Sequence, residues 1–396
     1  MTVSTATGSE ELVVELAGGG NRWGGHRARR ILVNVALYVV AMALALALAS
    51  VLIVIATDAA PFDVFHAMYE GSLSRPSAIG LTLDRAMPIL IVALGGIIAT
   101  RAAMFNIGLE GQLMVGGLMG AVVALKLGLP PSAALPLTIV ASAVGGGLWA
   151  GIASLLRFWR GVDVVISTLL LNFVAVEVLS FALNKSWLLQ ETTSNVQKLP
   201  QSDRLEPAYQ ITRIGTPPDF SVSTGIFLAV ILAGLVAFAL ARTRWGFRLK
   251  MLGMNPNAAR AAGVSLVAVG GSALVISGAF AGLAGGVIFA GTAFRIQPGF
   301  SANIGNDGLL VALIARRNVA ATVPVAFFFG AMRAGGGFLA ATGVPRYLVD
   351  VVQPLLVLAA LLPPAVLFVW DRRQALRTAR HEAEAHDRPT PIGAAA

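Results

Sequence analysis

The sequence predicts an all-α polytopic membrane protein with about ten transmembrane helices, and its hydropathy supports a range of eight to ten. Of its 396 residues, 56% are hydrophobic and only 12% are charged, whereas soluble domains carry about 25% charged residues. The apolar residues form runs longer than the roughly 18 residues needed to cross a bilayer. The solvent for most of this chain is therefore lipid.

The amino-acid composition also removes several classes of chemistry. The chain has no Cys, and its His residues (His26, His66, His381 and His386) all lie outside the apolar runs. Disulfides, thiolate nucleophiles and metal sites built from thiolates or imidazoles are therefore not expected. No Lys follows a Gly, so the phosphate-binding Gly-Lys-Ser/Thr loop is absent. Since no Ser/His/Asp or HExxH arrangement is visible either, the chain is expected not to be an enzyme and to bind no metal.

The distribution of charge predicts the orientation in the membrane. The net charge of +9 arises from 29 basic and 20 acidic residues, and Lys and Arg gather in the loops and tails that stay in the cytoplasm. Residues 1–30 end in the basic run HRARR and predict a disordered cytoplasmic tail, because a signal peptide would begin with its basic residues. The Arg-rich residues 371–396 predict a second cytoplasmic tail. The orientation of the chain in the membrane thus explains the excess of basic over acidic residues, and no nucleic-acid partner is needed to account for it.

Residues 31–370 form the predicted membrane domain, with five apolar spans in each half. In residues 31–184 the spans are Ile31–Ala56, Ala86–Thr100, Leu113–Leu127, Ser132–Leu156 and Val164–Leu183. In residues 225–370 they are Gly225–Ala241, Leu266–Gly291, Leu309–Ala315, Val319–Met332 and Leu348–Trp370. The neutral segment 185–224 is expected to be an extracellular loop, and the basic segment 242–265 a cytoplasmic loop. The number of transmembrane spans stays open between eight and ten, because the second, third, eighth and ninth spans are short or interrupted by Gly.

Three short matches, in the same order in both halves, indicate an internal duplication. NIGLEGQL at Asn106–Leu113 resembles NIGNDGLL at Asn303–Leu310, GGGLWA at Gly145–Ala150 resembles GGGFLA at Gly335–Ala340, and Asp163–Val165 recurs as Asp350–Val352. A unit with five spans, an odd number, must enter the membrane in the opposite direction when it is repeated. The predicted architecture is therefore two inverted five-helix repeats.

Polar residues between the two repeats form the candidate substrate pathway. Transporters with inverted repeats place their substrate there, where Gly-broken helices leave backbone groups unpaired by the helix itself. The fifth span adds polar side chains within an apolar run, and an ionisable group at that depth is costly unless it faces a cavity or a partner. The candidate pathway residues are Asn106, Glu110, Gln112, Thr168, Asn172, Glu177, Asn303 and Asp307. Alternatively, the Asn-Ile-Gly elements are polar loops at a membrane end, and Thr168 and Asn172 bind neighbouring helices.

The segment Arg244–Gly263 predicts a short, stiff helix on the cytoplasmic face. Asn255 can cap a helix, Pro256 suits its first turn and Gly263 suits its C-terminal end, so a helix is expected over Pro256–Ala262. Its small exposed side chains suit insertion into a cleft on another protein. A helix lying on lipid headgroups would show larger apolar anchors than Ala.

Four motifs, taken in order, resemble those of bacterial ABC-importer permeases of the nucleoside (guanosine-type) and simple-sugar branch, which is related to the ribose permease. They are MFNIGLEGQ at Met104–Gln112, VISTLLLN at Val165–Asn172, GMNPNAAR at Gly253–Arg260 and DGLLVAL at Asp307–Leu313. The resemblance runs from about Leu81 to Leu361. The chain departs from the family at Asn318-Val319, where Asn-Pro is usual, and at Ala315, where Gly is usual. The local shape near Arg316 and Arg317 therefore stays open.

The resemblance implies a multi-pass nucleoside permease in the bacterial cytoplasmic membrane, with the fold of the larger importer permeases such as the cobalamin importer. Its implied partners are a second homologous permease subunit, a cytoplasmic ATP-binding subunit and an extracellular substrate-binding lipoprotein. ATP and Mg would be bound by the partner ATPase, and no cofactor by this chain. The implied coupling helix, seated on the ATPase, comprises Gly253, Asn255, Pro256, Asn257, Ala258, Ala259, Arg260 and Gly263.

Two other transport functions remain open at this point. A simple-sugar importer permease of the ribose type would share the same architecture, and nucleosides are preferred because the Asn-Ile-Gly-x-Glu-Gly-Gln form resembles that branch more closely. An ion-coupled secondary transporter could use Glu110 and Asp307 as its coupling carboxylates. It would have no use, however, for a polar coupling helix.

Overall fold

The computed structural model describes residues 20–56, 60–192, 199–216 and 218–341, with isolated positions between 354 and 366. In this part of the chain nearly all regular structure is helical, apart from one two-stranded sheet. Eight of the described helices are long and apolar enough to cross a membrane, and the shorter Ile304–Ile314 is also apolar. The predicted all-α polytopic membrane fold is thus confirmed. The tenth predicted span, Leu348–Trp370, lies largely outside the described residues, and the tail 371–396 lies entirely outside them.

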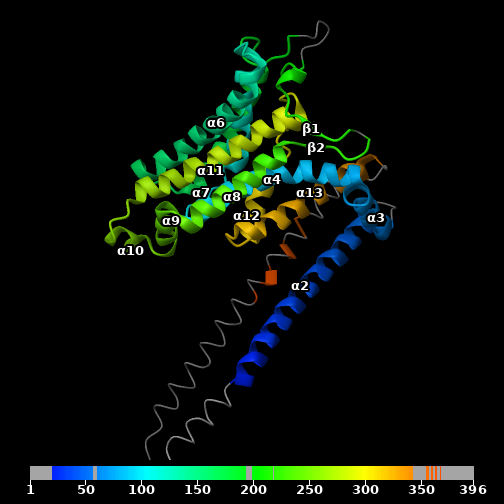
Figure 1. The fold of residues 1–396 in the computed structure, drawn as a ribbon, viewed down its shortest axis with the longest axis vertical. Coiled ribbons are helices and arrows are strands. Elements are labelled where there is room, and N and C mark those ends of the chain that lie inside the picture. The colour runs from blue at the N-terminus through cyan, green and yellow to red at the C-terminus, as the bar shows by residue number, and fades with distance from the viewer. Residues whose placement is uncertain are drawn as a thin grey trace, which may run out of the picture. The chain divides into compact units, whose positions relative to one another are not determined.

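The chain divides into two units, residues 1–61 with 350–396, and residues 62–349 (Figure 1). The first unit contains helix α2 (Gly20–Ala56). Because α2 begins at Gly20, residues 20–30 are helical, whereas the sequence predicted a disordered tail there. Once an apolar run has nucleated a helix, adding further residues at its end is favourable even when they are polar.

The second unit holds the remaining elements, in two runs separated by the segment 184–224. The first run comprises α3 (Pro61–Ser72), α4 (Pro76–Arg101), α5 (Leu109–Lys126), α6 (Pro131–Arg160) and α7 (Val164–Leu183). The intervening segment holds η1 (Pro207–Tyr209), β1 (Arg213–Ile214) and β2 (Val222–Ser223). The second run comprises α8 (Gly225–Arg242), α9 (Arg244–Met254), α10 (Pro256–Ala261), α11 (Leu266–Ile288), the π-helix η2 (Phe289–Ala293), α12 (Ile304–Ile314) and α13 (Val319–Ala341).

Helices α4 and α11 form the buried centre of this unit. They run antiparallel, because Gly95 of α4 meets Ser277, while Met104, beyond the end of α4, meets Gly270 near the start of α11. Helix α13 packs on α4, and α6 packs along α11 (Figure 1). The helices α4, α5 and α6 therefore occupy positions equivalent to those of α11, α12 and α13. This equivalence agrees with the duplication that the sequence predicts.

Glycine allows α6 and α11 to approach closely. Gly146 of α6 lies against Gly278 and Gly282 of α11, and a Cβ atom added at Gly146 would overlap the carbonyl oxygen of Gly278. Small residues at helix contacts let backbones pack tightly in a membrane, where lipid is as apolar as a side chain and the hydrophobic effect contributes little. The GGG motif of the first repeat is thus a packing surface.

The segment predicted as an irregular extracellular loop contains an ordered hairpin that is attached to α4. Strand β1 pairs antiparallel with β2, and Arg213 lies opposite Ser223. Asp84 of α4 forms an ion pair with Arg213 and accepts a hydrogen bond from the Ser223 amide at 2.8 Å. These contacts explain how α4, which begins at Pro76, accommodates Asp84, whereas the second span was predicted from Ala86. Asp84 interrupts the apolar run, but its charge is buried against a partner.

The close contact between α6 and α11 can be tested with Gly146→Ala. The added methyl group must push the two backbones apart, and such overpacking costs about 1–3 kcal/mol of unfolding free energy. Thermal unfolding of the purified protein in detergent should therefore show a lower Tm. Gly151→Ala, on the same helix, is the matched control because its Cβ would lie 3.9 Å from the nearest neighbouring atom. Equal Tm values for the two variants would contradict the tight contact.

Candidate functional site

The second Asn-Ile-Gly element places the N-terminus of α12 midway along α4. The two helices run parallel, because Gly308 meets Val92 and Gly96 meets Ala312. With 11 residues, α12 is about 16 Å long, roughly half of a 30 Å hydrocarbon core. Where both helices end, Arg101 Nη2 donates a hydrogen bond to the carbonyl oxygen of Arg317 at 2.9 Å. The start of α12 is therefore remote from that end of the bundle.

Glu110 connects the first repeat to this helix start. It lies buried in the first turn of α5, and its Oε2 accepts a hydrogen bond from the Gly305 amide at 2.7 Å. A carboxylate at this place pairs with an amide that the helix leaves unpaired and complements the positive end of the helix dipole. A Cβ atom at Gly305 would overlap the backbone of Glu110. The two helix N-termini thus meet inside the bundle.

Asp307, the counterpart of Glu110 in the second repeat, makes a different contact. Its Oδ2 forms an ion pair with Nε of Arg333 on α13, and the two side chains are only 8% and 15% exposed. Removing one partner of such a buried pair leaves an uncompensated charge. One acid of the repeat therefore caps a helix, and the other neutralises an arginine.

Asn106 and Gln112 form a buried amide cluster beside Glu110. Asn106 Nδ2 donates to Gln112 Oε1 at 2.9 Å and to Ser277 Oγ on α11 at 3.1 Å. Its Oδ1 accepts from Gln112 Nε2 at 3.1 Å and from the Gly108 amide at 3.0 Å. This cluster fixes the irregular segment between α4 and α5 against the central helix α11.

Thr168 and Asn172 hold the same segment from the side of α7. Thr168 Oγ1 accepts a hydrogen bond from the Ile107 amide at 3.2 Å. Asn172 accepts one from the Gly111 amide at 2.8 Å and donates one to the Ile107 carbonyl at 3.1 Å. Four residues apart on α7, the two side chains both pair with the backbone of the neighbouring segment, the kind of contact that the packing alternative predicts.

The structure does not bring Glu177 and Asn303 into these clusters. Glu177 is exposed on α7, one turn or more beyond Asn172. Asn303 is exposed and precedes α12 with a φ of 60°, a left-handed conformation that Asn tolerates better than most residues. The side chains of the other six predicted pathway residues are bonded at the two Asn-Ile-Gly elements, whereas Asn303, although it begins the second element, points to the surface.

The predicted cytoplasmic helix is present as α10, one residue shorter than expected. Asn255 Oδ1 accepts hydrogen bonds from the amides of Asn257 and Ala258 at 3.0 and 3.1 Å, and Pro256 occupies the first turn. Gly263 follows with a φ of 78°, where a side chain would be strained. Ala259 is buried, while the other side chains of α10 are exposed. The capping chemistry inferred from the sequence is therefore confirmed.

Gly253, at the end of α9, ties this segment to the end of α4. A Cβ atom at Gly253 would overlap the carbonyl oxygen of Arg101, the residue whose guanidinium group binds the carbonyl oxygen of Arg317, just beyond α12. The chain between Arg101 and α5 carries Asn106. Arg101 thus contacts the predicted coupling segment, leads into the first Asn-Ile-Gly element and is bonded to the loop that follows α12.

Sequence reasoning missed Ser277, Arg333 and Arg101 as parts of this site. A charged residue such as Arg333 beside an apolar span was a usable signal, since it requires a partner. The identity of that partner depends on tertiary packing, because Asp307 lies on another helix. Among the described residues, no three His, Asp or Glu side chains are grouped so as to hold a metal ion.

Comparisons with known proteins give a consistent picture. Residues 79–361 match the family described as "Branched-chain amino acid transport system / permease component". The glucose ABC transporter permease protein TsgB13 of Haloferax volcanii is 33% identical over 313 residues, which cover 77% of this chain and 81% of that protein. The guanosine ABC transporter permease protein NupP of Bacillus subtilis is 29% identical over 351 residues, with coverage of 87% and 97%. The nucleoside ABC transporter permease protein NupB of Lactococcus lactis is 25% identical, with coverage of 84% and 91%. No solved structure matches.

The buried pair of Asp307 and Arg333 can be tested with a double-mutant cycle. Asp307→Asn or Arg333→Gln alone leaves a buried charge without its main partner, which costs about 3–5 kcal/mol of unfolding free energy. The double variant removes both charges and should unfold closer to the wild type than either single variant does. Denaturation of the four purified proteins in detergent measures the coupling. Additive losses would show that the two side chains do not interact.

Proposed function

Because this chain belongs to the branched-chain amino acid transport system permease family, we propose that it is the membrane-spanning permease of an ABC importer for nucleosides. NupP and NupB, named for guanosine and nucleosides, match along most of this chain. The relatives named above are all permeases of ABC transporters, which favours this class over an ion-coupled secondary transporter. TsgB13, which has the highest identity of the three relatives, is named as a glucose permease. This similarity supports a sugar as the second candidate cargo.

The proposed energy source lies outside this chain. A cytoplasmic ATP-binding subunit holds ATP and Mg and hydrolyses the nucleotide, while a second homologous permease and an extracellular substrate-binding lipoprotein complete the importer. In this proposal the chain lies in the bacterial cytoplasmic membrane as a multi-pass protein with both termini in the cytoplasm. The gathering of basic residues in the tails and in the segment 242–265 supports this orientation.

The contact between Gly253 and Arg101 carries the mechanistic part of the proposal. The partner ATPases close on ATP and move the coupling helix, whose residues are Asn255, Pro256, Asn257, Ala258, Ala259 and Arg260, flanked by Gly253 and Gly263. At Gly253 the segment touches the backbone of Arg101, and Arg101 is bonded to the loop that follows α12. A displacement of the coupling helix is therefore passed to the chain that carries the first Asn-Ile-Gly element and, along α12, to the second element, which changes access to the pathway.

The proposed pathway runs along these two elements. Asn106, Gln112, Thr168 and Asn172 serve it as positioning residues, because their side chains are bonded to the segment that begins α5. Glu110 and Asp307 fix the start of α12. Asn303 and Glu177 are exposed and are the members of the set free to contact cargo or the second permease.

Gly253→Ala tests the mechanical link. The added methyl group meets the Arg101 backbone, which cannot move aside as a flexible side chain can, so we expect nucleoside uptake per ATP hydrolysed to fall about tenfold. This figure corresponds to the lower part of the 1–3 kcal/mol range for overpacking. The assembled importer in proteoliposomes provides both measurements. Gly234→Ala on α8 is the control, because nothing lies within 4 Å of its Cβ. Unchanged coupling in Gly253→Ala, with normal assembly, would refute the link.

The cargo is tested by competition for uptake. Proteoliposomes that contain the complete importer and its binding protein should accumulate radiolabelled guanosine in the presence of ATP, and unlabelled nucleosides should compete whereas glucose and ribose should not. Nucleosides add a base to the sugar, so a site that binds the base discriminates against sugars alone. Accumulation of radiolabelled glucose with no guanosine uptake would establish the sugar alternative.

A further inference from the structure

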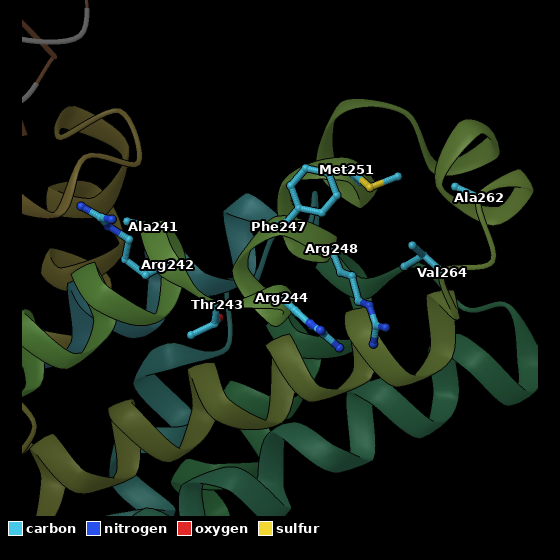
Figure 2. Close-up of a pocket in the computed structure, with 9 residues that line it drawn as sticks. All are labelled: Ala241, Arg242, Thr243, Arg244, Phe247, Arg248, Met251, Ala262 and Val264. Carbon is cyan, nitrogen blue, oxygen red and sulfur yellow. The ribbon is translucent and has the colours of Figure 1, made fainter.

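A basic pocket lies where α8 ends and α9 begins. Its volume is about 580 Å³, and its lining includes Arg242, Arg244 and Arg248 together with the apolar side chains of Phe247 and Met251 (Figure 2). The segment 242–265 contains no Asp or Glu. Within the described part of the chain, none of the three guanidinium groups has an ion pair or a hydrogen bond. The positive charge of the pocket is therefore not neutralised by the chain itself.

The start of α9 is held rigidly at the end of α8. Thr243 Oγ1 donates to the Ala239 carbonyl at 2.5 Å and accepts from the Gly246 amide at 3.1 Å, which caps α9. Trp245 Nε1 donates to Ser272 Oγ of α11 at 3.1 Å. Since α8 is one of the helices able to cross a membrane, these contacts fix the first turns of α9 near the membrane boundary.

Arg244 and Arg248 are arranged to share one anion. They lie four residues apart on α9 and extend from it in the same direction, whereas Arg242 points away from them (Figure 2). Like charges at this spacing on a helix repel each other. A phosphate group between them would relieve the repulsion, and guanidinium groups bind phosphate with paired, charge-assisted hydrogen bonds.

An apolar surface continues from this charged pair. Phe247 is 63% exposed, and Met251 lies one turn further along α9. A helix that exposes a large apolar side chain beside arginines is typical of the membrane interface, where the ring enters the acyl boundary and the charges meet the headgroups. Helix α10 differs, since its exposed side chains are small or polar. The two neighbouring helices therefore present surfaces of different chemistry.

We propose that this pocket binds an anionic phospholipid. Arg244 and Arg248 hold the phosphate, Arg242 adds to the local positive potential, and Phe247 with Met251 packs against the glycerol and upper acyl chain. Clustered basic residues directly beyond a span favour anionic lipids through such a potential. An acidic surface of the ATP-binding subunit would also neutralise the arginines. It would have no need of an exposed Phe beside them at the end of a span, so the observations favour lipid.

The proposal requires only that α8 crosses the membrane, and it is independent of the cargo and of ATPase coupling. The test uses the full-length chain reconstituted into vesicles of phosphatidylcholine and phosphatidylglycerol. The protein is extracted gently, and native mass spectrometry measures how much of each lipid remains bound. We expect the wild type to retain phosphatidylglycerol selectively. The double variant Arg244→Gln/Arg248→Gln should bind it about 25-fold more weakly, at about fivefold per basic residue.

Lys250→Gln is the matched control, because Lys250 is exposed on the same helix but does not line the pocket. It removes one charge of the same sign and should retain phosphatidylglycerol nearly as well as the wild type. Equal losses in Lys250→Gln and the double variant would overturn the proposal, since they would indicate a diffuse charge effect. Unchanged lipid retention in the double variant would also overturn it. In a parallel purification of the assembled importer, loss of the ATP-binding subunit from the double variant with unchanged lipid retention would assign the pocket to the protein partner.

Discussion

Irregular backbone inside a membrane must find its hydrogen-bond partners within the protein, and a group of buried polar side chains in this bundle meets that requirement. The segment that leads into α5 lacks the hydrogen bonds of a continuous helix, and lipid offers no substitute. Thr168 and Asn172 of α7 pair with three of its backbone groups, and Asn106 pairs with a fourth. These side chains fix the shape of the irregular segment, which can change only if the elements that carry them move together.

The two halves keep their helix arrangement but not their electrostatics. Glu110 and Asp307 occupy corresponding positions in the duplicated motif, yet Glu110 caps α12 while Asp307 is paired with Arg333. Two carboxylates at the meeting point of two helices need separate sources of positive potential, which the helix N-terminus and the guanidinium group supply. The two helices also differ in length, since α5 has 18 residues and α12 has 11.

Local chemistry made part of this structure predictable. The cap at Asn255, the Pro at the first turn and the left-handed Gly263 are all short-range features, so α10 was placed to within one residue. The start of α4 was misplaced because Asp84 interrupts the apolar run, and its neutralisation by Arg213 depends on a hairpin more than 120 residues away. The same limit applies to Arg333 and to the choice between pathway and packing for Asn172. Such pairings are determined by tertiary structure, which hydropathy and capping rules do not encode.

The geometry at Arg101 suggests how a displacement on one face could reach the middle of the bundle. Its carbonyl leaves no room for a side chain at Gly253, its guanidinium group binds the loop that follows α12, and its peptide leads into the Asn106 segment. A flexible side chain at position 253 could absorb a small movement by changing rotamer, whereas direct contact between two backbones transmits it. Gly253 therefore makes the contact with Arg101 stiff, in addition to leaving room for it. The same reasoning applies to α6 and α11, whose backbones are in direct contact at Gly146, Gly278 and Gly282, so that a displacement of one helix is passed to the other.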